Sequence, residues 1–302
     1  MQFDIKQLGP LFRTTFGEWN QKDPFRQSAV IAYYAVFSLP GLLMLIIAIS
    51  GYFFGREAVN QSILYQVSAT MGTNTADQIK EMLDQADQSK TGIIGSIIGF
   101  IILLIGATGV FVELQKTLNI IWKVKVVPQK GIIKIIKARL FSFGLILAIA
   151  FLLLISLVIS TALAAMSNLL RSDSMGLVVL IFNVLNFIVS LVVISALFAM
   201  MFKILPDAKI KWKHVWMGSL LTGILFTLGK TALAFYFGKA DPASGYGAAG
   251  SIILILLWVS YSSMILFFGA EFTAAYTKLH SGTVPPTEIA KKTAPTTEEK
   301  VL

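Results

Sequence analysis

Apolar residues in this chain fall into six blocks, separated by shorter polar stretches. Each block has about 20 or more largely apolar residues, enough at 1.5 Å rise per residue to cover roughly 30 Å of hydrocarbon. The pattern therefore predicts an all-α polytopic membrane protein, with six transmembrane helices in one bundle. The blocks run over residues 28–54, 92–112, 140–166, 177–205, 215–237 and 247–275.

The composition supports a membrane class. Of 302 residues, 56% are hydrophobic and only 14% are charged, whereas soluble domains are about a quarter charged. There is no cysteine, which excludes disulfides and thiolate metal sites, and the only histidines are His214 and His280. We expect no metal centre and no cofactor.

Lysine and arginine predict the orientation. Most of these 25 residues lie before the first block, after the second, after the fourth and in the tail, which places both termini in the cytoplasm. The formal net charge of +9 is then largely a topology signal, and no nucleic-acid partner is needed.

One basic segment follows the second block. The run IIKIIKARL alternates cations with isoleucine pairs, as expected for a segment that lies at anionic lipid headgroups. A simple positive-inside anchor has the same pattern. The candidate headgroup residues are Lys130, Lys134, Lys137 and Arg139.

Three further segments lie outside the blocks. Residues 1–27 contain an amphipathic pattern at positions 8–19, which fits an interfacial helix or a stripe packed against the bundle. The connection 55–91 predicts two short helices that separate near residues 72–74. The transmembrane domain covers residues 28–279, and the tail 280–302 lacks an apolar set and is expected to be disordered.

Glycine and proline mark packing surfaces and candidate helix breaks. Glycines in the second block, including a Gly95–Gly99 pair, would let another helix approach closely, either within the bundle or in a homo-oligomer. The first block is interrupted near its middle, and a glycine-rich stretch opens the sixth. The candidate break residues are Pro40, Gly41, Gly245, Gly247 and Gly250.

Two glutamates touch the ends of the blocks and one lysine lies well inside a block, where charge is costly and often functional. Glu113 and Glu271 lie at the predicted cytoplasmic ends, and Lys230 lies in the outer half of the fifth block. They would line a polar route through the bundle. Alternatively, the lysine extends to the outer headgroups and the glutamates lie in the inner headgroup layer.

Three separated motifs carry a resemblance to a known family. AYYAVFSLPGLLMLIIA, GVFVELQKTLNIIWKV and YGAAGSIILILLWVSYSSMILFFGAEF together resemble the YihY/BrkB family of bacterial inner-membrane proteins, over nearly the whole chain. The resemblance implies six transmembrane helices and a cytoplasmic-membrane location. Glu113, Asn119 and Trp122 match the family's first polar motif, and Gly269, Ala270 and Glu271 match its last.

The family is associated with several functions: ribonuclease BN, virulence or serum resistance, and transport of lipids or ions. A ribonuclease needs clustered carboxylates or a histidine pair, and no such constellation is present here. We therefore expect no enzymatic activity. The favoured hypothesis is a transporter or lipid-handling protein for an anionic lipid or ion, with Glu113, Asn119 and Glu271 meeting near the inner end of one cavity. A membrane scaffold is the alternative.

Overall fold

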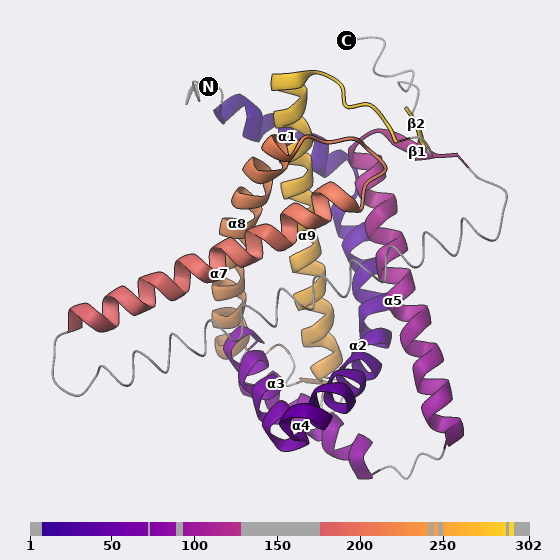
Figure 1. Ribbon diagram of the computed structural model, residues 1–302, viewed down its shortest axis with the longest axis vertical. Coiled ribbons are helices and arrows are strands. Elements are labelled where there is room, and N and C mark those ends of the chain that lie inside the picture. The colour runs from indigo at the N-terminus through magenta and orange to yellow at the C-terminus, as the bar shows by residue number, and fades with distance from the viewer. Residues whose placement is uncertain are drawn as a thin grey trace. The chain divides into compact units, whose positions relative to one another are not determined.

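The computed structural model describes residues 8–71, 73–88, 93–127, 176–240, 242, 245–246, 250–287 and 290–292. The predicted third span and the basic residues Lys130, Lys134, Lys137 and Arg139 lie outside these residues. Nearly all of the described chain is helical (Figure 1). The elements are α1 (Leu8–Gln21), α2 (Pro24–Phe54), α3 (Arg56–Met71), α4 (Thr73–Gln88), α5 (Ile93–Ile121), β1 (Val124–Val126), α7 (Gly176–Ile204), α8 (Trp212–Ala240), α9 (Gly250–Ser281) and β2 (Ala290–Lys292).

The chain divides into two compact units, which are described separately. The first unit comprises Met1–Glu18, Gln115–Ile224 and Phe268–Leu302. The second unit comprises Trp19–Leu114 and Leu225–Phe267. Helices α1, α5, α8 and α9 each contribute residues to both units.

Three of the described helices are long and apolar enough to cross a membrane. They cover Leu180–Ile204, Trp212–Ala240 and Ile252–Ser281, which correspond to the predicted fourth, fifth and sixth spans. Helices α2 and α5, with 31 and 29 residues, cover the first and second predicted spans. The helical character predicted from the apolar blocks is thus confirmed in all five helices, and three of them have the length and apolar composition of a membrane span.

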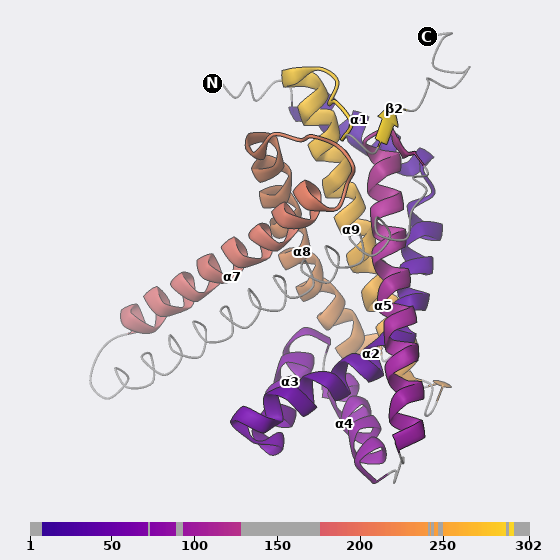
Figure 2. The same cartoon turned by 45° about the vertical axis from the view of Figure 1, so that its right-hand side comes forward.

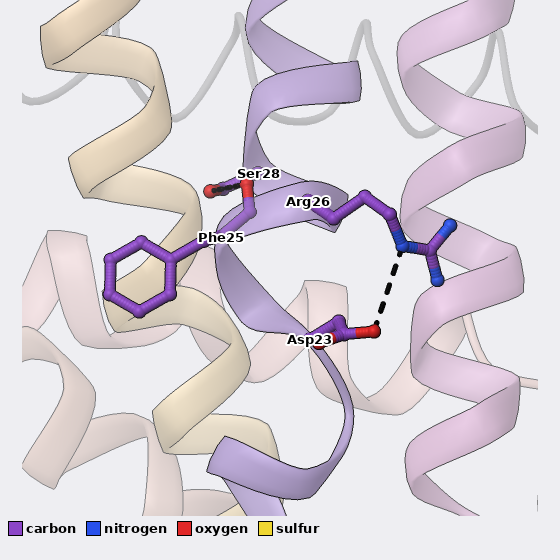
Figure 3. Close-up of polar contacts among 4 residues, drawn as sticks. All are labelled: Asp23, Phe25, Arg26 and Ser28. Atoms are coloured by element: carbon purple, nitrogen blue, oxygen red, sulfur yellow. Dashed lines mark hydrogen bonds and ion pairs between the residues drawn. The ribbon is translucent and has the colours of Figure 1, made fainter.

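The start of α2 follows from a local signal. Pro24 occupies the first helical position, where a missing N–H costs nothing, and Asp23 before it adopts a positive φ of 50°. The Arg26 side chain lies 3.8 Å from the Asp23 carboxylate, and the Ser28 hydroxyl donates to the Phe25 carbonyl at 3.0 Å (Figure 3). Both contacts span three residues, as expected within one helical turn.

Helix α2 continues through Pro40 and Gly41 to Phe54, so these residues do not end the helix, and the predicted kink there stays a prediction. A single proline removes one backbone hydrogen bond, and in an apolar stretch a helix still satisfies the remaining groups. The predicted close approach at small residues is found in the second unit. A Cβ atom on Gly106 would lie 2.9 Å from the Ser38 Cβ, and one on Gly109 would overlap the Tyr34 ring.

Helices α3 and α4 form the predicted pair of short helices, with the boundary at residue 72 between them. They lie side by side in both views (Figures 1 and 2). Val59 of α3 and Ile79 and Leu83 of α4 form a small buried cluster. The apolar periodicity of residues 55–91 therefore serves packing between these two helices.

The amphipathic stripe of α1 packs against other helices in the first unit. Leu11 is buried with Phe272 and Tyr276 of α9, and the Phe12 ring lies 5.3 Å from the Phe272 ring. Part of the stripe predicted at positions 8–19 thus serves helix packing. Phe16 on the same helix remains exposed.

Part of the segment expected to be a disordered tail is ordered, whereas residues 288–289 and 293–302 lie outside the described residues. Helix α9 extends to Ser281, and residues 282–287 and 290–292 are held by backbone contacts. β2 pairs antiparallel with β1, and Ala208 forms a bridge with Pro286. A polar segment without an apolar set can be ordered in this way, because backbone hydrogen bonds do not depend on side-chain hydrophobicity.

Candidate functional site

Buried polar residues of the first unit cluster around Asp207, in the loop between α7 and α8. The Asn119 amide, near the end of α5, donates to the Asp207 Oδ2 atom at 2.8 Å, and its Oδ1 accepts from the Asp207 backbone N–H at 2.7 Å. Gln115, one turn earlier, donates to the same Oδ2 atom at 3.2 Å. We call Gln115, Asn119 and Asp207 the amide–carboxylate cluster. Its hydrogen bonds fix the end of α5 to the loop before α8.

The C-terminal segment is attached to the same loop. The Thr287 N–H donates to the Asp207 carbonyl at 3.0 Å, and the Lys209 N–H donates to the Pro285 carbonyl at 2.9 Å. The Lys203 ammonium donates to the Ile210 carbonyl farther along the loop. Asp207 therefore binds α5 through its side chain and its backbone N–H, and the C-terminal segment through its backbone carbonyl.

Helices α8 and α9 meet through a reciprocal contact of glycine and threonine. Each helix carries a glycine followed four residues later by a threonine: Gly218 and Thr222 on α8, Gly269 and Thr273 on α9. A Cβ atom on Gly218 would overlap the Thr273 hydroxyl, and one on Gly269 would overlap the Thr222 hydroxyl. We call these four residues the glycine–threonine interface. It is a small-xxx-small contact of the kind that brings membrane helices close together.

The threonines satisfy their own polar groups within their helices. Thr222 donates to the Gly218 carbonyl at 2.6 Å, and Thr273 donates to the Gly269 carbonyl at 2.7 Å. Thr277 repeats the pattern one turn later, donating to the Thr273 carbonyl at 2.7 Å. These hydroxyls can therefore be buried between helices without losing hydrogen bonds.

Glu271 lies on α9 between Gly269 and Thr273 and is only 3% exposed. Because α9 continues to Ser281, this glutamate is about three turns inside the helix and not at its end, as the apolar block had suggested. Its neighbours in sequence, Ala270 and Phe272, are also buried. An ionisable side chain buried within a membrane-spanning helix is costly and is a functional candidate by default.

Glu113 and Lys230 belong to the second unit, and both are partly buried. Helix α5 continues about two turns beyond Glu113, so this glutamate also lies inside its helix. Asn119 and Glu271 belong to the first unit. The predicted meeting of Glu113, Asn119 and Glu271 in one cavity remains a prediction.

In the glycine-rich stretch before α9, no other segment packs closely against Gly245. Gly245 is exposed, and a Cβ atom there would meet nothing within 4 Å. Gly250 begins α9, and Gly247 lies outside the described residues. A tight connection between α8 and α9 explains the stretch equally well.

The two histidines take part in structural contacts at helix ends. The buried His214 ring lies 2.9 Å from the Ser281 hydroxyl through Nε2, and the His280 Nδ1 lies 3.0 Å from the Tyr276 carbonyl. Within the described ranges, no three His, Cys, Asp or Glu side chains are grouped to hold a metal ion.

Sequence reasoning identified Asn119 and Glu271 but missed Asp207, which lies just beyond the fourth apolar block. This aspartate could have been singled out, because the other charged residues of the loop are all lysines. It also missed the glycine–threonine interface. The segments GSLLT and GAEFT, residues 218–222 and 269–273, share the same spacing and could have indicated it.

Comparison with known proteins identifies the family. The model of the family described as virulence factor BrkB matches residues 15–294. A UPF0761 membrane protein of Verminephrobacter eiseniae is 30% identical over 72% of this chain and 49% of its own length. A UPF0761 membrane protein of Pseudoalteromonas atlantica is 28% identical over 87% of this chain and 85% of its own length. One of Mannheimia succiniciproducens is 26% identical over 96% of this chain and 98% of its own length.

The chain spans about half the length of the first relatives that it matches. No solved structure matches the chain. The relatives are named as membrane proteins, in agreement with the three long apolar helices. The chain is a membrane protein of the virulence factor BrkB family, as its three sequence motifs predicted.

Proposed function

We propose that the protein moves an anionic lipid or ion through its helix bundle in the bacterial inner membrane. In this proposal it has six transmembrane helices and both termini in the cytoplasm. Glu271, Asn119 and Asp207 act in the first unit, and Glu113 and Lys230 act in the second. The proposal assigns no catalytic step and no cofactor to the chain.

The burial of Glu271 carries the proposal. Ionisable residues within membrane-spanning helices are rare, and those that occur often line the path of an ion or substrate. In a low-dielectric interior the Glu271 carboxylate interacts strongly with any charge that passes. A buried carboxylate that binds a proton or cation as an anion moves is one recognised role of such residues in transporters.

The surface charge of the first unit supports an anionic cargo and a cytoplasmic orientation. Among its described residues, every exposed charged side chain is a lysine or an arginine. Its described acidic residues are the buried Asp207 and Glu271 and the partly buried Glu18. A surface of one sign raises the local concentration of oppositely charged ligands.

A scaffold without transport is the second candidate. Two observations favour it: the close packing at the glycine–threonine interface, and the hydrogen bonds that both ends of the Asn119 amide make to Asp207. A static bundle also requires such contacts. The two proposals differ in what they expect when the charge of Glu271 is removed without changing its shape.

We expect Glu271→Gln to lower flux about tenfold or more in liposomes that contain the purified protein, while the protein stays folded. The measurements are release of entrapped phosphate or chloride and exposure of a fluorescent anionic lipid to a quencher. Glu57→Gln is the matched control, because Glu57 is exposed on α3 and undergoes the same chemical change. Equal flux in the parent and Glu271→Gln proteins, or no flux in the parent, would favour the scaffold.

A further inference from the structure

The two-stranded sheet of the first unit places two lysines directly opposite each other. In the antiparallel register, Lys125 of β1 pairs with Lys291 of β2, and both side chains are exposed. Directly opposite residues in an antiparallel pair have Cβ atoms about 5 Å apart on the same face, where like charges are unfavourable. The strand pairing thus brings two positive charges together, and their repulsion weakens the sheet.

The opposite face of the sheet is partly buried. Side chains alternate along a strand, so Val124 and Ala290 point away from the lysine pair, and both are buried. This burial fixes which face Lys125 and Lys291 occupy. The two ammonium groups therefore project together on the exposed face.

No compensating acid is found within the part of the chain that the structure describes. Neither Lys125 nor Lys291 forms an ion pair with a described residue. The first unit has no exposed acidic side chain among its described residues. A sheet of three residue pairs is marginal by itself, and two opposed ammonium groups weaken it further. An anion bound between the two lysines would remove this repulsion.

Neighbouring residues place the pair near the level of lipid headgroups. The segment before β2 is bonded to the loop that leads into α8. There Trp212 and Trp216 are exposed beside Lys211 and Lys213. Tryptophan flanked by lysine at the end of a spanning helix is typical of the membrane–water interface.

We propose that Lys125 and Lys291 together bind the phosphate group of an anionic lipid headgroup, and that this bound headgroup holds the C-terminal segment on β1. Neither lysine is among the residues assigned to the proposed transport path. The headgroup site does not depend on transport, because a scaffold could bind the same headgroup. Loss of flux in Glu271→Gln and loss of headgroup binding in the lysine variants are independent results.

The test is hydrogen exchange of the strand amides in the purified full chain in non-ionic detergent. The probe is short-chain phosphatidylglycerol, compared with short-chain phosphatidylcholine and with inorganic phosphate at equal concentration. We expect phosphatidylglycerol to slow exchange in β1 and β2 severalfold in the parent, and phosphatidylcholine to have no effect. Without any lipid, Lys125→Gln and Lys291→Gln should themselves slow exchange about 1.5- to 5-fold, because the repulsion is gone.

Lys292→Gln is the matched control, because Lys292 is the next residue on the same strand, is equally charged and exposed, and points to the other face. The slowing by phosphatidylglycerol should persist in Lys292→Gln and vanish in Lys125→Gln and Lys291→Gln. The proposal is overturned if no anionic probe slows exchange, or if Lys292→Gln loses the effect as fully as Lys291→Gln. It is also overturned if inorganic phosphate reproduces the whole effect, because the ligand is then the free ion.

Discussion

Gly218→Leu is expected to destabilise the folded state by about 3 kcal/mol, which is a loss of roughly 150-fold in the folding equilibrium. A Cβ atom at this position overlaps the Thr273 hydroxyl and lies 3.2 Å from the Thr273 Cα atom. Because part of the obstruction is backbone, rotation of a side chain cannot relieve it. The helices α8 and α9 would have to separate locally, and the packing around Thr222 and Gly269 would be lost with them.

The free energy of unfolding, measured by titration with a denaturing detergent, checks this prediction. Gly238→Leu is the control on the same helix, because a Cβ atom there meets nothing within 4 Å. It should leave stability unchanged or raise it by up to about 1 kcal/mol through helix propensity. In addition, Thr273→Ala should partly rescue Gly218→Ala, since it removes the overlapping hydroxyl. Additive effects of these two changes would show that the reciprocal contact is absent.

Asp207→Ala is expected to cost about 2–4 kcal/mol of unfolding free energy. The change removes the carboxylate acceptor of the Asn119 and Gln115 amide N–H groups, which lie in a largely buried position. Because Thr287 is bonded to the Asp207 backbone, movement of this loop should also release the C-terminal segment. Hydrogen exchange at residues 282–292 should therefore accelerate.

Two further variants separate charge from hydrogen bonding at Asp207. Asp207→Asn keeps the shape and an oxygen acceptor, so its cost should be well below that of Asp207→Ala. Asp84→Ala changes an exposed aspartate of α4 in the second unit and should leave exchange at residues 282–292 unaltered. If Asp207→Ala were as stable as the parent, the amide–carboxylate cluster would have no structural role.

The helices could largely be predicted from the sequence, because burial in lipid requires long apolar runs and satisfied backbone groups. The predicted helix pair within residues 55–91 was also correct, since Val59, Ile63 and Val67 in one helix and Ile79 and Leu83 in the other recur at four-residue spacing. Helix ends were less well predicted. Hydropathy placed Glu113 and Glu271 where each span ends, whereas the helices continue through the polar residues that follow.

The candidate site could be predicted only in part, because it depends on contacts between residues distant in sequence. Asn119 and Asp207 are 88 positions apart, and no local pattern pairs them. The order of the C-terminal segment was missed for a related reason: its backbone bonds to the Asp207 loop are invisible to a hydrophobicity argument. Glu271 was found because an acid within an apolar helix is conspicuous in any sequence.

Access of water to position 271 tests the central claim most directly. The chain has no cysteine, so Glu271→Cys and Thr273→Cys each introduce a single thiol. In intact liposomes that contain the protein, a small charged thiol reagent should modify Glu271→Cys at least about tenfold faster than Thr273→Cys, whose position packs against Gly218. Equal and negligible rates for the two variants, with prompt reaction of both after unfolding, would contradict a polar route past Glu271.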